Sequence, residues 1–336
     1  MSEGTSASPG RAATATRLAY ILAASHSGST LLAMLLGSHP KVCTVGELKA
    51  TGIGDGERYL CSCGEPIGKC LFWADVHREM GRRGLDFDVT GAGTDLRSGG
   101  GAYVDRLLRP LHRGPLLEHL RDAALAASPS WRSRIRRIQR LDAALASCLC
   151  DLTGKKVVVD SSKVGIRLKY LLRNPALDVR VIRLVRDGRA VALTYVDPAH
   201  YADAKDPRVR GGGMGGDRES ERRPMAAAAH EWRRSNEEAE AIVRHLHPAR
   251  WTELRYEELC ADPSATLARL FAFIGVDPTQ VALKPPGDHH VVGNGMRLDP
   301  DIEVRLDDRW TGALTRRELD VFDSVAGSTN RRYGYR

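Results

Sequence analysis

The chain has 336 residues, enough for one large α/β domain or two modest ones with a buried core. Its 42% hydrophobic and 27% charged residues are typical of a globular protein, and no apolar run reaches the length of roughly 18 residues that spans a membrane. The net charge of +8 suits an anionic ligand, but the low aromatic content of 6%, with no aromatics interleaved among basic blocks, argues against nucleic acid.

The N-terminal segment 1–16 is small and polar. It lacks the apolar core of a secretory signal, so we expect a disordered N-terminus and a cytoplasmic protein without a membrane partner.

A strand, a polar loop and a helix are predicted next. Residues 18–24 are apolar and short enough for one buried strand, 25–30 (SHSGST) form a loop, and 31–36 are apolar again before Gly37 and Pro40 end the helix. This arrangement aims backbone N–H groups and the positive end of a helix dipole at an anion. The loop matches neither the Walker A pattern nor the G-x-S-x-G elbow of esterases. It indicates a phosphate or sulfate cradle, although a plain turn can have the same composition.

Three cysteines follow at a spacing that leaves several interpretations open. Cys61, Cys63 and Cys70 could bind a metal with His77 or Cys43 as the fourth ligand, form a local disulfide, or remain free thiols that brace a loop. The C-x-C spacing is not one of the paired spacings typical of zinc sites. We therefore expect free thiols and no bound metal.

The segment 51–150 is predicted to be an insertion of helices and loops. Helices are expected over 73–83, 103–128 and 131–150, and the Gly-rich segment 86–101 is expected to be a loop with little to pack. The arginines of the last helix are too closely spaced to lie on one face, which is typical of a solvated surface.

Two further strands end in basic residues. Residues 155–160 are predicted to be a buried strand with Lys163 just beyond it, followed by a helix over 166–172. Residues 179–185 are predicted to be another strand, followed by Arg186 and a helix that carries Thr194. Ligands of open α/β sheets bind at the carboxyl ends of the strands, so these side chains are candidates for anion binding.

The remaining segments complete an α/β pattern. The Gly-rich segment 198–224 has almost no apolar residues and is predicted to be a mobile loop. A helix over 225–247, a strand over 251–255, a helix from Asp262 to residue 274 and a final helix from Thr315 follow.

The first loop, HSGSTLLAMLLGSHPKV followed by Gly-Glu, resembles the 5′-phosphosulfate loop of sulfotransferases that use 3′-phosphoadenosine 5′-phosphosulfate (PAPS), including the tyrosylprotein sulfotransferases. The resemblance implies that the 5′-phosphate is held by hydroxyls and backbone amides of Ser27, Gly28, Ser29, Thr30 and Leu31. His26 stands where the family usually has Arg or Lys.

Later matches occur in the same order as in that family. Arg186 and Thr194 fit its 3′-phosphate motif, and the segment LRYEEL implies that Tyr256 lies near the adenine. A late loop similar to that of related bacterial enzymes implies nucleotide contacts from Gly293, Asn294 and Arg297. The resemblance covers residues 17–336 as a single domain, is weakest over 85–150, and implies a three-layer α/β fold like that of P-loop NTPases, with a mainly parallel central sheet.

The resemblance also implies a mechanism. Glu47, in the Gly-Glu that follows the first helix, is the candidate general base for in-line transfer of a sulfuryl group from PAPS to a hydroxyl, which releases PAP (3′-phosphoadenosine 5′-phosphate). We expect Glu47 to be partly buried, because a surface Glu is a weak base. Lys163, in a DSSK sequence that recurs in the family, and His26 are expected to share the developing charge, and no metal is required.

The acceptor could be a small molecule, a glycan or a peptide. Two other functions stay open: a P-loop-related kinase or NTPase that uses ATP or GTP with Mg²⁺, and a non-catalytic PAP-binding module. The missing Walker lysine and the second phosphate motif argue against the first of these.

Overall fold

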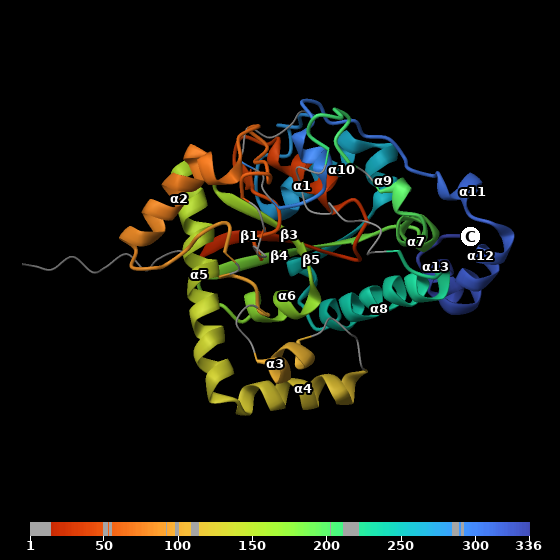
Figure 1. Cartoon of the computed structure of the whole chain (residues 1–336), viewed down its shortest axis with the longest axis horizontal. Helices are drawn as coiled ribbons and strands as arrows, with labels where there is room; N and C mark the ends of the chain where they lie inside the picture. The colour runs from red at the N-terminus through yellow and green to blue at the C-terminus, as the bar shows by residue number, and fades with distance from the viewer. Residues whose placement is uncertain are drawn as a thin grey trace, which may run out of the picture.

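The computed structural model describes residues 15–49, 53, 56–91, 93–97, 101–108, 114–201, 203–210, 222–283, 289 and 292–336. Its centre is a parallel five-stranded sheet with the strand order β2-β3-β1-β4-β5 (Figure 1). The strands are β1 (Thr16–Ala23), β2 (Val42–Thr44), β3 (Val157–Lys163), β4 (Leu177–Val185) and β5 (Trp251–Arg255). The predicted parallel α/β sheet is confirmed.

Helices cover both faces of the sheet, which makes three layers (Figure 1). Alternate residues of β1 face opposite ways: Ile21 packs in one core with α1 (Ser29–Gly37) and α10 (Pro263–Ile274), and Tyr20 packs in the other with α5 (Pro129–Thr153) and α8 (Met225–Val243). Both faces of the sheet are buried, so the strands are apolar without alternation. Each fully buried Leu, Ile or Val contributes about 1.5–3 kcal/mol to stability.

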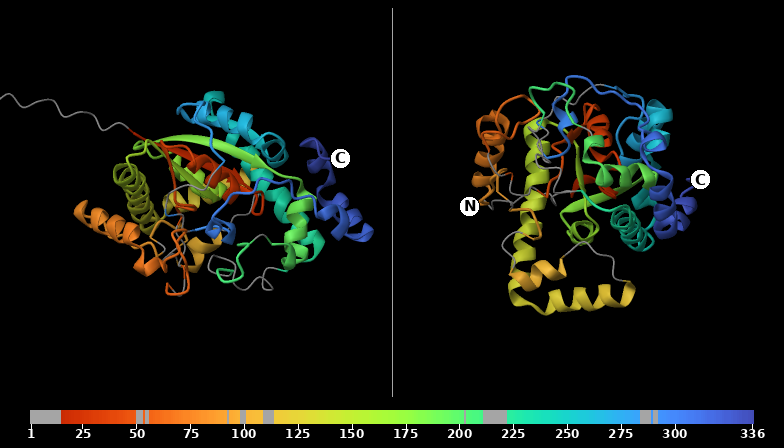
Figure 2. Two further views of the ribbon diagram at one scale, coloured as in Figure 1. Left: turned by 90° about the horizontal axis from the view of Figure 1, so that it is seen from above. Right: turned by 45° about the vertical axis from the view of Figure 1, so that its right-hand side comes forward.

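The other helices lie around this sandwich. They are α2 (Leu71–Arg82), α3 (Ala102–Leu107), α4 (Pro115–Ala127), α6 (Gly165–Leu171), α7 (Gly188–Val196), α9 (Tyr256–Ala261), α11 (Trp310–Ala313), α12 (Arg316–Phe322) and α13 (Ser328–Arg332). Helices α3 and α4 project from the body beside the far end of α5 (Figure 2). Within the described residues, no helix is both long and apolar enough to cross a bilayer.

Several predicted elements differ from the structure. The helix predicted over 103–128 is two helices, α3 and α4, and α8 ends four residues before the predicted end at His247. Part of the predicted mobile loop, residues 202 and 211–221, lies outside the described residues.

The loop between α2 and α3 is anchored, contrary to the expectation that it has little to pack. The Thr94 side chain is fully buried, and its hydroxyl donates to the Leu48 carbonyl at 2.6 Å. Its own carbonyl accepts a hydrogen bond from Arg167 at 2.9 Å. Phe87 and Val89 of the same loop are buried in the hydrophobic core, so apolar packing and polar contacts together anchor the loop.

The strand order brings three loops to one place. Strands β3 and β4 lie on either side of β1, so the segments that follow all three strands meet at the carboxyl edge of the sheet. The β1–β3 register shifts there: Tyr20 is opposite Asp160, but Leu22 is opposite Lys163. This bulge inserts one extra residue into β3, and Lys163 has a left-handed φ of 68°. Bulges of this kind redirect side chains, and here the bulge turns Lys163 toward the edge of the sheet.

Candidate functional site

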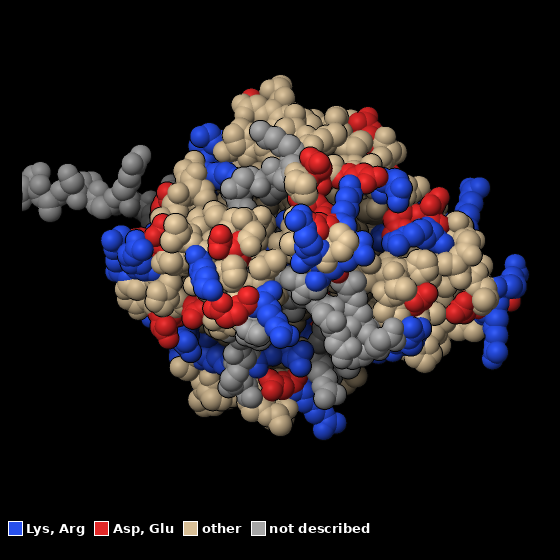
Figure 3. All heavy atoms as spheres, turned by 45° about the horizontal axis from the view of Figure 1, so that its top comes forward, with Lys and Arg blue, Asp and Glu red and all other residues tan. Residues whose placement is uncertain are grey.

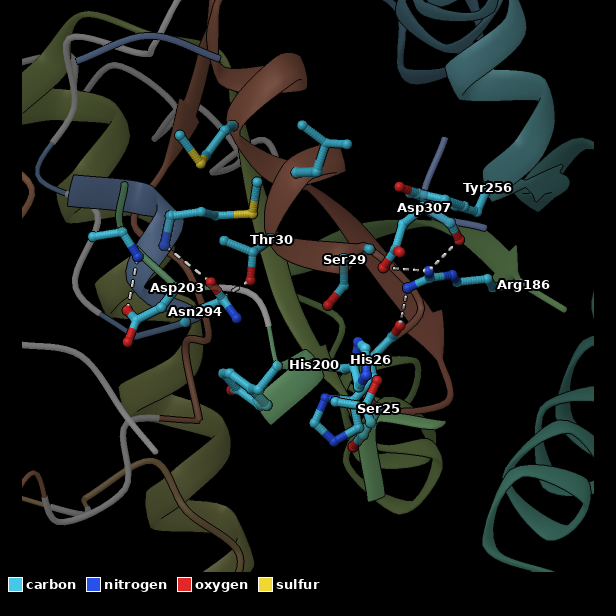
Figure 4. A pocket seen from close by; sticks show the side chains of 18 of the residues that line it. Ser25, His26, Ser29, Thr30, Arg186, His200, Asp203, Tyr256, Asn294 and Asp307 are labelled. Carbon is cyan, nitrogen blue, oxygen red and sulfur yellow. Dashed lines mark hydrogen bonds and ion pairs between the residues drawn. The ribbon is translucent and has the colours of Figure 1, made fainter. Parts of the chain in front are cut away.

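A cavity of about 1080 Å³ opens at this edge. Its volume is at the upper end of small-molecule sites, enough for two ligands side by side. Figure 4 shows side chains from the first loop, the end of β4 and the late chain pointing into it. Most of the predicted site residues line it: His26, Gly28, Ser29, Thr30, Leu31, Glu47, Lys163, Arg186, Thr194, Tyr256, Gly293 and Asn294.

The loop before α1 has the backbone geometry of an anion site. His26 and Gly28 have left-handed φ values of 62° and 87°, and α1 begins directly afterwards at Ser29. A Cβ at Gly28 would lie 2.7 Å from the Tyr256 ring, so glycine is needed for the turn and for the close approach. Successive amides in such a turn, at a helix N-terminus, form a concave binding site for an oxyanion.

Two predicted ligand-binding residues do not line the cavity. Ser27 is 1% exposed, and its hydroxyl is buried beneath the loop. Arg297 is 2% exposed, and its guanidinium lies 5.2 Å from the centre of the Tyr59 ring. The short helical turn Gly295–Leu298 directs Arg297 toward the interior. The predicted roles of the Ser27 hydroxyl and of Arg297 at the nucleotide are therefore wrong for this structure.

His26 is uncharged in the structure. Burial lowers the pKa of His26 to about 3, and the positive charges of Lys163, Arg186 and Arg223 act in the same direction. Its ring packs edge-on against Tyr195, with 4.6 Å between ring centres. A neutral imidazole offers a hydrogen bond and no net charge. The expected role of His26 in sharing the developing charge stays a prediction.

Glu47 and Lys163 form an ion pair at the floor of the cavity. The Lys163 ammonium donates to a Glu47 carboxylate oxygen, and the Lys49 ammonium lies 3.3 Å from the other oxygen. The Glu47 side chain is 11% exposed, so the predicted partial burial is confirmed. Burial raises the pKa of Glu47, but Lys163 and Lys49 together outweigh it and hold the pKa below its usual value. Glu47 is thus ionised, as a proton acceptor must be.

A buried polar network holds the Glu47 segment in place. One Asp160 oxygen accepts the Leu48 N–H at 3.1 Å, and the Ser162 hydroxyl accepts the Lys49 N–H at 3.1 Å. Arg167 donates to Asp160 at 3.1 Å and to Asp142 at 2.9 Å. The role of Asp160 in this network was not predicted from the DSSK pattern, because its partners come from distant parts of the chain.

Arg186 lies at the opposite side of the first loop from Lys163. It donates to the His26 carbonyl at 2.9 Å and to an Asp307 carboxylate oxygen at 2.9 Å. Its guanidinium also lies 4.5 Å from the centre of the Tyr256 ring. Figure 4 shows Arg186 held between Asp307 and His26. Thr194, in the second turn of α7, lines the same cavity.

Asp307 was not predicted from the sequence. Burial raises its pKa, but hydrogen bonds from Arg309 and Arg186 outweigh this and hold the pKa well below its usual range. The ionised Asp307 carboxylate therefore binds one side of the planar Arg186 guanidinium. The only available signal was an Asp among charged residues near the C-terminus, which is common on any surface.

The late chain closes one wall of the cavity. Val292 pairs with Gly46 in a parallel bridge, and its carbonyl accepts the Glu47 N–H at 3.1 Å. The Asn294 N–H donates to the Thr30 hydroxyl at 3.3 Å. A Cβ at Gly295 would lie 1.8 Å from a side-chain oxygen of Asp203, so a larger residue there would displace that side chain. These contacts explain why Gly293 and Asn294 face the cavity.

Charges of both signs surround the cavity. Its outer lining includes the basic residues Lys49, Arg97, Lys205, Arg210, Arg223, Arg305 and Arg309 and the acidic residues Asp203, Glu231, Asp299, Asp301 and Glu303. Figure 3 shows the same mixture of basic and acidic side chains over the molecular surface on the side it presents. The net positive charge therefore does not form a uniform basic patch.

The three cysteines of the C-x-C segment lie close together. Cys61, Cys63 and Cys70 converge with His289, and not with the predicted partners His77 or Cys43. The His77 ring is 2.7 Å from the Phe87 carbonyl instead. None of the seven cysteines, all within the described ranges, is in a disulfide.

Comparisons with known proteins agree with this site. Residues 167–280, which include Arg186, Thr194 and Tyr256, match the model of the sulfotransferase family. Human carbohydrate sulfotransferase 2 is 34% identical over 133 residues, which cover 32% of this chain and 25% of that protein. Mouse carbohydrate sulfotransferase 5 is 34% identical over 140 residues, 40% of this chain and 35% of that protein. The predicted likeness to sulfotransferases is confirmed.

These matches are partial. The chain spans about a quarter to a third of the length of the curated relatives it matches. The solved sulfotransferase domain from the curacin biosynthetic pathway aligns with 96% of this chain and 99% of its own, at 18% identity and a TM-score of 0.48. The first loop and Glu47 lie outside the family-model match, so their roles depend on the geometry described above.

The state of His26 predicts a change of stability with pH. The pKa of His26 is near 6.5 in the unfolded chain and about 3 in the folded protein. At pH values between these two, only the unfolded chain binds a proton at His26, so the free energy of unfolding decreases as the pH falls. Relative to wild type, His26→Gln should gain about 2 kcal/mol in unfolding free energy between pH 7 and pH 5. Urea denaturation at both pH values measures this. A constant difference between the two proteins would show that His26 titrates normally.

Proposed function

We propose that this protein is a sulfotransferase that moves a sulfuryl group from PAPS to a hydroxyl of an acceptor and releases PAP. The observation that carries the proposal is the presence of two anion-binding groups in one cavity: the amides at the start of α1, and Arg186, just before α7, with Thr194 in the second turn of that helix. A nucleotide with phosphates at both its 5′ and 3′ positions fits such a pair. The names of the relatives, carbohydrate sulfotransferases, support the same reaction.

PAPS is oriented by contacts to its 5′-phosphosulfate and to its 3′-phosphate. Amides from Gly28 to Leu31, with the Ser29 and Thr30 hydroxyls, hold the 5′-phosphosulfate at the positive end of α1. The planar fork of Arg186 meets oxygens of the 3′-phosphate in pairs, which Lys cannot do. The Tyr256 ring lines the cavity and lies against both Gly28 and Arg186. It is therefore placed beside the adenosine, which connects the 5′-phosphosulfate to the 3′-phosphate.

The transfer step uses the ion pair at the floor of the cavity. Glu47 takes the proton from the hydroxyl group of the acceptor substrate. As the hydroxyl oxygen forms its bond to sulfur, the bond from sulfur to the 5′-phosphate oxygen breaks. Lys163 moves from Glu47 toward the 5′-phosphate oxygen, which gains negative charge as its bond to sulfur breaks. Because the paired Lys163 lowers the pKa of Glu47, this movement makes Glu47 a stronger base. His26 contributes a neutral hydrogen bond to the group in transit.

We propose a carbohydrate or similar polyol as the acceptor. Carboxylates on the far side of the cavity, including Asp203, Asp299 and Asp301, are acceptors for several hydroxyl groups. The carbohydrate sulfotransferases among the relatives support this class of acceptor. Transfer of labelled sulfate from PAPS to a panel of sugars, phenols and peptides tests it, and labelling of phenols or peptides alone would contradict it.

Two alternatives remain distinguishable. A kinase or NTPase would need a cation at the β- and γ-phosphates, but the first loop carries the neutral His26 and no lysine. Calorimetry should therefore detect PAP binding at least about tenfold tighter than ATP binding, a difference of 1.4 kcal/mol. A non-catalytic PAP-binding module would bind PAP equally well but would transfer no label from PAPS.

Replacement of Glu47 tests the general base. Glu47→Gln should lower turnover at least about a hundredfold, the usual minimum for a general base, and leave PAP affinity within about threefold of wild type. The surface variant Glu258→Gln is the matched control and should leave both quantities unchanged. Equal turnover in the two variants would remove Glu47 from the mechanism.

Replacement of Arg186 tests the 3′-phosphate site. Arg186→Ala should weaken PAP at least about tenfold, because hydrogen bonds to charged groups contribute about 1.5–3 kcal/mol. Arg186→Lys keeps the charge but loses the fork, so it should recover only part of the affinity. Arg180→Ala, in strand β4 and bonded to the Ala249 carbonyl, is the control. Unchanged affinity in both Arg186 variants would refute the assignment.

Asp307 predicts a gain of affinity. Its carboxylate occupies one side of Arg186 and must repel a 3′-phosphate bound there. Asp307→Asn should therefore tighten PAP at least about fivefold, since two unit charges 4 Å apart interact by about 1 kcal/mol even in water. The neighbouring Asp308→Asn should have a smaller effect. Weaker PAP binding in Asp307→Asn would mean that the carboxylate positions Arg186 for the ligand and does not compete with it.

A further inference from the structure

Four side chains behind the cavity wall have no role in the proposed reaction. Cys61, Cys63 and Cys70 come from one segment and His289 from another, and their four potential ligand atoms all lie within 4.8 Å of one another. His289 is 219 residues from Cys70 in the sequence. Three sulfurs and an imidazole nitrogen are the donor set of a structural zinc site.

Four of the six distances between these atoms are close to those of a tetrahedron around zinc. Zinc bonds of about 2.3 Å to sulfur and about 2.0–2.1 Å to nitrogen place two sulfurs roughly 3.8 Å apart and a sulfur and a nitrogen roughly 3.5 Å apart. The Cys63–Cys70 and Cys61–Cys70 sulfur pairs are both 3.7 Å apart. The His289 Nδ1 atom lies 3.6 Å from the Cys61 sulfur and 3.2 Å from the Cys70 sulfur.

The local backbone presents the ligands to a common centre. Leu60 pairs with Pro66 in an antiparallel bridge, and the turn between them, with Gly64 at φ 89°, carries Cys61 and Cys63. Cys70 is the N-cap residue of α2, so its sulfur lies at the positive end of that helix.

The imidazole is also held in place. The His289 ring stacks on Phe72, with ring centres 4.6 Å apart and an angle of 7° between the planes. This stacking restricts the ring while its Nδ1 atom faces the sulfurs.

We propose that Cys61, Cys63, Cys70 and His289 bind one Zn²⁺ ion in a closed structural site. On binding, each of the three thiols loses its proton to solvent and His289 coordinates as the neutral imidazole. Four protein ligands leave no position for water or substrate, so the metal is structural and not catalytic. This proposal replaces the expectation of free thiols, and His289 takes the place of the fourth ligand assigned to His77 or Cys43.

The metal would fix one wall of the cavity. Three residues after His289, Val292 pairs with Gly46 and accepts the Glu47 N–H, and Asn294 follows at the Thr30 hydroxyl. On the cysteine side, Tyr59 lies beneath the Arg297 guanidinium. Zinc therefore joins the cysteine turn to the segment that positions the candidate base and the first loop. This role rests on the proposed function, whereas the metal site does not.

Metal content of the untagged 336-residue chain, purified under reducing conditions, tests the site. Elemental analysis should find one zinc per chain, and titration with cobalt(II) should produce thiolate-to-metal charge-transfer absorption. Zinc affinity should fall at least about tenfold in Cys61→Ser and His289→Ala, since loss of even an outer partner of a metal ligand costs that much. The controls Cys150→Ser and His77→Ala should retain zinc.

A second measurement on wild-type protein covers the case that the variants do not fold. Cys63 is exposed, so as a free thiol it should react rapidly with a thiol reagent. As a zinc ligand it should react slowly until a strong chelator is added, and zinc should then be released. Rapid reaction without chelator, absence of zinc, or a mass that reveals a disulfide among these cysteines would overturn the proposal.

PAP affinity with and without zinc separates the two proposals. If zinc orders the wall, its removal should weaken PAP binding at least about tenfold while circular dichroism shows an intact fold. Stoichiometric zinc with unchanged PAP affinity would keep the metal site but exclude its role at the cavity. Stoichiometric zinc in a protein that never binds PAP would overturn the proposed function and leave the metal site standing.

Discussion

The buried ion pair between Lys163 and Glu47 is the interaction on which the site depends. Burying two charges is costly unless other groups hold them in good geometry. Here the bulge in β3 turns Lys163 inward, and Asp160 and Ser162 bind the backbone on the C-terminal side of Glu47. Arg167 in turn neutralises Asp160. The ion pair of Lys163 and Glu47 is thus the outermost layer of a charged network that extends into the core.

The protein pairs its candidate binding groups with its own atoms. Arg186 is paired with Asp307, Lys163 with Glu47, and His26 stays neutral among three cations. A phosphorylated ligand would replace these internal partners, so its affinity reflects an exchange of contacts and not simple addition of new ones. Such an arrangement keeps the cations positioned in the absence of ligand and limits the cost of leaving them unpaired in a buried site.

The cavity is built from segments that are remote in sequence, and this explains why its walls need fastening. The first loop and Glu47 are close to the start of the chain, whereas Val292 and Asn294 are near its end. Main-chain bonds join these segments beside the sheet, and the cysteine cluster with His289 lies behind the same junction. Attachment at two points restricts the late segment far more than either point alone, because each contact reduces the conformational entropy left to the chain.

Local patterns in the sequence determined the strand, loop and helix at the N-terminus, the parallel sheet, and the positions of Lys163, Arg186 and Thr194. Strand periodicity, turn residues and the spacing along a helix act over a few residues, so they can be read without the fold. Only the tertiary structure decided that Arg297 turns toward Tyr59, that Asp307 occupies Arg186, that His26 is uncharged, and that His289 completes the cysteine cluster. Each of these depends on contacts or fields between segments far apart in the chain, which no local pattern encodes.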